Sequence, residues 1–139
     1  MNEDVRVAKV ASTLVILGIY EYGGTVDPQG RSADLTSGYS VGGAVESLVV
    51  QVPKHGFDVL KLLVQVEDWY REATKVRPLE FTGVWSDAGF MFFDGVNIIQ
   101  DRDEALRIGN ERGQVAIWDF AEVEEVNVYD AIKAAGAVE

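Results

Sequence analysis

The segment DVLKLLVQVEDWYREAT, residues 58–74, decides how the rest of this chain must fold. Its apolar residues recur every three or four positions, the spacing that gathers side chains on one face of a helix. These residues are Val59, Leu62, Leu63, Val66, Trp69, Tyr70 and Ala73. Asp58 is a typical N-cap and Pro78 follows the expected end. The sequence therefore predicts an amphipathic helix that packs across a hydrophobic surface.

Two apolar segments before this helix predict strands that contribute to that surface. Residues 13–22 are rich in Leu, Val, Ile and Tyr and are ended by a pair of glycines, and residues 44–52 are stopped by Pro53. The apolar part of the first segment, residues 10–20, is too short to span a bilayer and lacks the basic flank of a signal peptide. We therefore expect a core strand there and no membrane association.

The chain after the helix changes to short strands separated by turn residues. FTGVW and GFMFF flank residues 86–88, which predict a hairpin turn, and Asp94 with Gly95 predicts a second turn or a bulge before VNII. Asp101 and Glu104 then form a capping box, so a helix is expected to begin there. These signals all favour an antiparallel arrangement.

The last forty residues predict one more helix end, two strands and a final short helix. Gly113 stands where a left-handed C-terminal cap belongs. Residues 115–120, VAIWDF, are apolar on both alternating faces apart from Asp119, which predicts a strand that is covered on both sides or lies well inside a sheet. Residues 122–128 predict an acidic strand that leads into the final helix near Asn127.

The fold class that follows is α+β, with a mostly antiparallel sheet, one long amphipathic helix packed on a face and two shorter helices. With 139 residues, of which 47% are hydrophobic, we expect a single domain, residues 1–139. Trp69, Trp85 and Trp118 lie in apolar periodic segments, so we place them in or beside the core, with ligand recognition as the alternative. Cysteine is absent, which excludes disulfides and thiolate chemistry and fits a cytoplasmic location.

The net charge of −11 is unevenly placed along the chain. Residues 1–79 hold 10 acids and 8 bases, whereas residues 80–139 hold 13 acids and 4 bases. Such an acidic chain disfavours direct nucleic-acid binding, because affinity for phosphates comes from Lys and Arg. It favours a protein partner with a basic face, unless the charge serves solubility alone. The candidate contact residues are Asp87, Asp94, Glu122, Glu124 and Glu125.

The stretch GYSVG, residues 38–42, matches the G-x-S-x-G pattern of a hydrolase nucleophile elbow. Glu46 and His55 follow Ser40 in the chain order that a catalytic triad requires. The flanking residues oppose the pattern, since RSADLTS is too polar for a central strand and VGGAVESLVV opposes a helix. We therefore interpret this stretch as a glycine-rich bend and predict no catalytic residue.

Carboxylates raise the question of a metal site or an acid-base residue. Asp87, Asp94, Asp101 and Asp103 each have an ordinary place in a turn or at a helix start, so we predict no metal and no cofactor. Asp119 stands between Trp118 and Phe120 in an apolar strand, where an unpaired carboxylate is costly. We expect an arginine partner, Arg107 or Arg112, or a site carboxylate with a raised pKa.

Three stretches within residues 38–120 carry a resemblance: GYSVGGAVESLVV, GVWSDAGFMFFD and DRDEALRIGNERGQVAIWDF. They resemble small uncharacterised proteins encoded by phages and prophages of actinobacteria. The resemblance implies no known activity and no catalytic residue. It implies a setting, the cytoplasm of an infected bacterial host, where small acidic proteins often bind host or defence proteins.

Together these observations predict a non-catalytic binding or accessory protein that acts through a protein-protein interface. One alternative is a structural or assembly protein, in which strands at residues 44–52 or 122–128 pair between copies to form homo-oligomers. The other alternative is a small hydrolase or ligand-binding domain that uses Ser40, His55 or Asp119.

Overall fold

A computed structural model describes residues 2–136, which contain four helices and seven strands. The strands pair antiparallel, so the predicted α+β class is confirmed. The predicted number of helices is wrong, because two helices of 18 residues and two shorter ones are present in this part of the chain.

Internal contacts group the chain into two compact units. The first is Met1–Asp34 with Val45–Gly95, and the second is Leu35–Ala44 with Val96–Glu139. The expectation of a single domain stays a prediction.

The first helix of the first unit corrects the predicted strand at residues 13–22. The helix α1, Glu3–Tyr20, begins at Asn2, whose side chain accepts a hydrogen bond from the amide of Val5 at 2.9 Å. Its buried residues are Val7, Val10, Ala11, Leu14, Val15 and Gly18, which follow helical spacing. The β-branched residues of this segment favour a strand weakly, and burial of a helical face overrides that preference.

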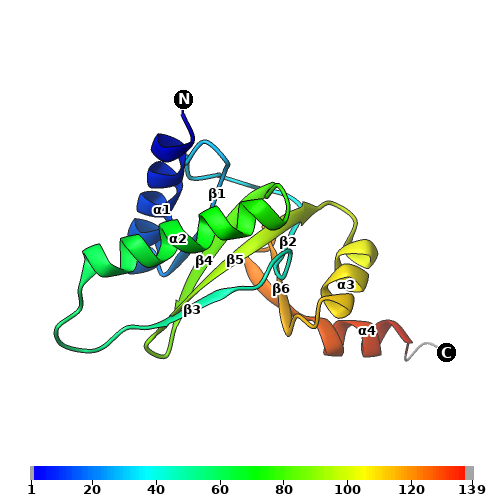
Figure 1. Cartoon of the computed structure of the whole chain (residues 1–139). Coiled ribbons are helices and arrows are strands. Elements are labelled where there is room, and N and C mark those ends of the chain that lie inside the picture. The colour runs from blue at the N-terminus through cyan, green and yellow to red at the C-terminus, as the bar shows by residue number, and fades with distance from the viewer. Residues whose placement is uncertain (1, 137–139) are drawn as a thin grey trace. The chain divides into compact units, whose positions relative to one another are not determined.

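The second helix confirms the prediction made from residues 58–74. The helix α2, Val59–Val76, begins after Asp58, whose carboxylate accepts from the amide of Lys61 at 3.1 Å. It buries Leu62, Val66, Tyr70 and Ala73. Figure 1 shows α2 lying across β4, Phe81–Asp87, and β5, Phe90–Ile99.

Four strands make the sheet of the first unit. The edge strand β1, Gly23–Val26, pairs with β4, β4 pairs with β5, and the residues of β5 before Val96 pair with β3, Leu48–Gln51. The strand β3 is shorter than the predicted 44–52. The β4–β5 hairpin turns at Ala88 and Gly89, both with positive φ, as a two-residue turn requires.

The predicted turn at Asp94 and Gly95 is wrong, because both residues lie inside β5. The strand continues through this Asp-Gly pair because adjacent residues of β5 pair with neighbouring strands. Phe93, for example, lies opposite Leu48 of β3. The strand therefore runs on from the first unit into the second.

The second unit pairs the end of β5 with three further strands. They are β2, Tyr39–Val41, β6, Ala116–Asp119, and β7, Glu124–Asn127, in the order β5-β2-β6-β7. Of the two predicted alternatives for β6, the one that places it well inside the sheet is confirmed, because β6 lies between β2 and β7. It is not covered on both faces: Ile117 and Asp119 are buried, whereas Trp118 between them is 37% exposed. One face of β6 is therefore core and the other faces solvent.

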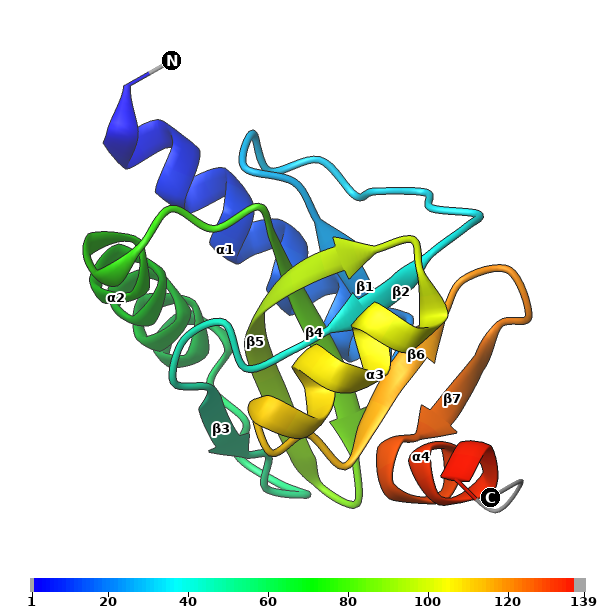
Figure 2. The ribbon, with the colours of Figure 1, turned by 90° about the vertical axis from the view of Figure 1, so that its right-hand side faces the viewer.

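Two helices cover the buried face of this second sheet, as Figure 2 shows for α3 over β2 and β6. The helix α3, Arg102–Glu111, begins at Asp101, which accepts from the amide of Glu104 at 2.9 Å, so the predicted cap is confirmed. Gly113 has φ +69°, the left-handed conformation expected after the helix. The helix α4, Val128–Gly136, follows β7 directly and is capped by Asn127, as predicted.

Candidate protein-binding surface

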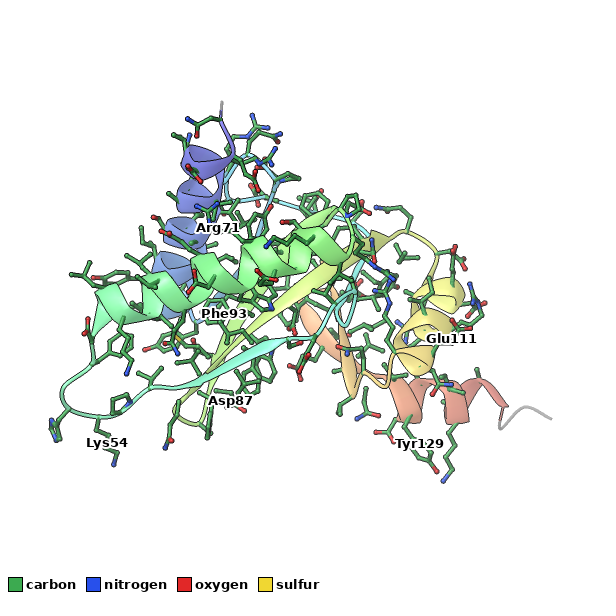
Figure 3. All side chains as sticks on the ribbon, viewed as in Figure 1. Lys54, Arg71, Asp87, Phe93, Glu111 and Tyr129 are labelled. Atoms are coloured by element: carbon green, nitrogen blue, oxygen red, sulfur yellow. The ribbon has the colours of Figure 1, made fainter. Side chains whose placement is uncertain are left out.

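Both helices of the first unit lie on one face of its sheet. Met91 and Phe93 of β5 point to that face, since a Cβ added to Gly18 of α1 would meet the Met91 side chain and the Phe93 ring lies 6.4 Å from Trp69 of α2. Figure 3 shows Phe93 beneath α2. Because side chains alternate along a strand, the intervening residues of β5 point to the opposite face. We call that opposite face the open face.

The open face carries aromatic side chains that are partly exposed. Trp85 is 40% exposed and Phe90 is 39% exposed, while Val49, opposite Phe92 on β3, is 52% exposed. The rings of Trp85 and Phe92 stack, with centroids 4.3 Å apart and planes inclined by 14°. Phe90 lies 6.4 Å from Phe92. An aromatic row across two strands is therefore available to a partner.

Asp94 lies at one end of this row. Its carboxylate accepts a hydrogen bond from the Ser47 hydroxyl. Burial raises the pKa of Asp94 above its ordinary value of 3.8, and the polar groups of Ser47 and Trp85 oppose that rise. Half-buried Asp94 therefore places a carboxylate beside the aromatic row.

Asp87 lies at the other end of the row. It is the last residue of β4, exposed, and directly before the hairpin turn (Figure 3). It is two residues from Trp85 on the same strand, so the two side chains point to the same face. Asp87 and Asp94, both predicted contact residues, are thus brought onto the open face of the first unit.

The other three predicted contact residues lie in the second unit. Glu122 is in the turn between β6 and β7, and Glu124 and Glu125 are on β7 itself, the edge strand of that sheet. All three are exposed, and within residues 2–136 none forms an ion pair. Glu125 lies opposite Trp118 and Glu124 opposite Asp119. This edge is therefore negative along its length.

The distribution of charge differs from that expected from the two halves of the sequence. By residue content the first unit carries −5, from 13 acids and 8 bases, and the second carries −6, from 10 acids and 4 bases. The seven strands hold five carboxylates and no Lys or Arg. The carboxylates are Asp87, Asp94, Asp119, Glu124 and Glu125. The basic side chains are thus confined to helices and loops, and the charge on the strands is entirely negative.

The structure gives Asp119 backbone amides as partners in place of the expected arginine. The Asp119 carboxylate accepts from the backbone amides of Ala121 at 3.0 Å and Glu122 at 3.2 Å. Arg107 instead pairs with Glu111 on its own helix, and Arg112 donates to the carbonyl of Gly42 and to the Asn97 side chain. Asp119 therefore closes the turn that leads to the acidic edge.

The residues of the hydrolase alternative lie on different elements. Ser40 is in the middle of β2, opposite Ile98 and Trp118, and belongs to the second unit. Glu46 and His55 are exposed residues of loops in the first unit. No side-chain hydrogen bond of Ser40 or His55 is found in the described part of the chain. The G-x-S-x-G stretch is a short strand between Gly38 and Gly42 rather than a strand-to-helix turn.

Trp85 and Trp118, predicted to lie in or beside the core, are 40% and 37% exposed. Phe92 and Ser47 were not singled out from the sequence. The alternation in FTGVWSD and FMFFD, read together with the two-residue turn at Ala88 and Gly89, is the signal that places both rings on one face. Among residues 2–136 no cluster of three acidic or histidine side chains could hold a metal ion, and no helix is long and apolar enough to cross a bilayer. Comparisons with protein-family models, with curated proteins and with solved structures find no match to this chain.

Proposed function

We propose that this chain is a non-catalytic accessory protein that binds a basic face of another protein. The observation that carries the proposal is that every charged residue on the seven strands is acidic, while the open face of the first unit also exposes stacked aromatic rings. Interfaces are enriched in aromatic side chains, and opposite charge steers association. The contacts we assign are Asp87 and Asp94 on the open face and Glu122, Glu124 and Glu125 on the β7 edge.

The setting we propose follows from the resemblance to phage and prophage proteins. It is the cytoplasm of a bacterial host, where the partner is a host or defence protein. A basic partner of this kind includes proteins that themselves bind nucleic acid, because their binding faces are positive. This chain would then occupy such a face without contacting nucleic acid itself.

Capture from a bacterial lysate with two matched variants tests the proposal. Each variant neutralises four exposed acids to Asn or Gln and therefore has the same net charge. The surface variant changes Asp87, Glu122, Glu124 and Glu125, and the control variant changes Glu3, Glu21, Asp34 and Asp68. We expect a partner that the wild type and the control retain at low salt, that the surface variant loses, and that high salt releases.

Two results would contradict the proposal. Equal loss of the partner by both variants would mean that total charge matters and the placement of the acids does not. If no partner is retained at low salt and released at high salt, the proposed electrostatic interface is contradicted.

A second candidate function is self-assembly through the edge strand β3. Its four residues, LVVQ, carry no charge, and β5 is the one strand with which β3 pairs among the described residues. An uncharged, apolar edge strand is a template for pairing with another chain. The β7 edge opposes the same role, because its glutamates would repel a second copy. Light scattering after size exclusion, with Val49→Lys as the variant, distinguishes this candidate: a dimer that Val49→Lys disrupts would support it.

A further inference from the structure

One side of the Trp85 indole is open and faces a position without a side chain. Its other side stacks on Phe92 of β5. The cross-strand partner of Trp85 on β1 is Gly23, so no side chain stands above the sheet beside the ring there. The next residue pair on this face along the strands is Gly83 with Thr25, where Thr25 is buried. Trp85, which is 40% exposed, therefore presents part of its ring beside Gly23 of β1.

One side of the ring is packed against a neighbour. The indole of Trp85 stacks on Phe92, with centroids 4.3 Å apart and planes inclined by 14°. A side chain that is already ordered loses little conformational freedom when a partner binds. The stack on Phe92 thus preorganises the indole for a ligand on its free side.

The electrostatics of this position favour a cation. Asp87 lies two residues along β4 on the same face, about 7 Å from Trp85 at the usual rise of a strand. None of the seven strands found in residues 2–136 carries Lys or Arg, so no basic side chain on the strands of this sheet competes for the indole face. The face of an indole attracts a cation, and a carboxylate beside it strengthens that attraction.

We propose that the free side of Trp85, above Gly23, binds an arginine side chain of the partner protein, with the guanidinium stacked on the indole and hydrogen-bonded to Asp87. Arginine fits better than lysine because its guanidinium is planar, stacks on aromatic faces and donates two parallel hydrogen bonds to a carboxylate. This assignment rests on the proposed function, since the basic partner supplies the arginine.

The test uses the full chain and three short peptides that differ in one residue. The probes are acetylated, amidated Gly-Gly-X-Gly-Gly with X as arginine, lysine or citrulline. Citrulline keeps the planar shape of arginine and removes its charge. The indole N–H resonances of the three tryptophans report which ring the peptide contacts. We expect the arginine peptide to shift the Trp85 resonance, with citrulline binding at least about fivefold more weakly.

Trp118 provides the matched control. It is exposed to a similar degree, 37% against 40%, and lies opposite Glu125, but within the described residues it has no stacked ring. We expect Trp85→Leu to abolish arginine binding and Trp118→Leu to leave it unchanged, with folding of both checked by circular dichroism. Asp87→Asn, on an exposed residue, should weaken arginine binding about threefold or more and reduce its preference over citrulline.

Four results would overturn the assignment. The first is a shift of the Trp118 resonance in place of the Trp85 resonance. The second is equal binding of the lysine and arginine peptides, and the third is unchanged binding after Trp85→Leu. The fourth is a Trp85 shift that depends on protein concentration alone, which would indicate a contact between copies. The lysate experiment separates this failure from failure of the proposed function. If the surface variant still loses the partner but Trp85→Leu retains it, the proposed binding of a basic partner is supported and the proposed arginine site is contradicted.

Discussion

Replacing Phe93 by alanine tests which face of the first sheet is the core. The Phe93 side chain has 0% of its surface exposed and lies beneath α2, with its ring 6.4 Å from that of Trp69. Truncation of a buried phenylalanine costs about 3–5 kcal/mol, from lost burial and from the cavity that remains. Since a domain has an unfolding free energy of about 5–15 kcal/mol, this is a large share of the total.

Phe92, the next residue on the same strand, is the matched control. It points to the open face, is half-buried and stacks on Trp85. Its replacement by alanine loses the stacking interaction of about 0.5–1.5 kcal/mol and part of its buried area. We expect a total cost of about 1–2 kcal/mol, less than half that of Phe93→Ala.

Urea unfolding, followed by circular dichroism and by tryptophan fluorescence, measures both costs. With a slope of about 2 kcal/mol per molar urea, the midpoint should fall by about 1.5–2.5 M for Phe93→Ala and by about 0.5–1 M for Phe92→Ala. Equal shifts, or a larger shift for Phe92→Ala, would mean that the two faces of β5 are wrongly assigned. The open face and the arginine site would then lose their basis.

Substitutions at three further positions test single side chains. Burial raises the pKa of Asp94 in the folded state, so the stabilisation by protonated Asp94 is present below the unfolded pKa of 3.8 and is lost as pH rises through the folded pKa. The unfolding free energy of Asp94→Asn should therefore rise relative to that of wild type between pH 4 and pH 7. A difference that stays constant with pH would refute this. Thr82→Val should raise the unfolding free energy by about 1 kcal/mol, since the buried Thr82 hydroxyl has no hydrogen-bond partner among the described residues. A lower unfolding free energy in urea would indicate that the hydroxyl does have a partner. Asp119→Ala should cost about 1–3 kcal/mol through the amides of Ala121 and Glu122, whereas Asp119→Asn, which keeps an acceptor oxygen, should cost less; equal thermal shifts would remove the turn-closing role.

The elements that the sequence determined are those whose signals lie within a few residues. The helix α2 follows from its apolar spacing and the cap at Asp58, and α3 follows from Asp101 and Gly113. In each helix the N-cap carboxylate accepts from the backbone amide three positions along the chain, and Gly113 supplies the left-handed conformation after α3. Such interactions are nearly independent of the rest of the fold, so they could be predicted.

The elements that were missed depend on partners distant in the chain. Residues 13–22 contain enough β-branched side chains to suggest a strand, and α1 is helical because its buried face packs on β1, β4 and α2. Asp94 and Gly95 have turn composition, yet pairing keeps them extended. Local preference amounts to less than 1 kcal/mol per residue, so tertiary packing decides these cases.

The candidate surface divides in the same way. The acidic character and the absence of cysteine follow from composition alone. The stacking of Trp85 and Phe92 on the side of the sheet away from α1 and α2 depends on packing, and so does the contact of Ser47 with Asp94 across 47 positions. Alternation along a strand fixes that neighbouring residues face opposite ways, but which face is covered depends on helices that pack from elsewhere in the chain.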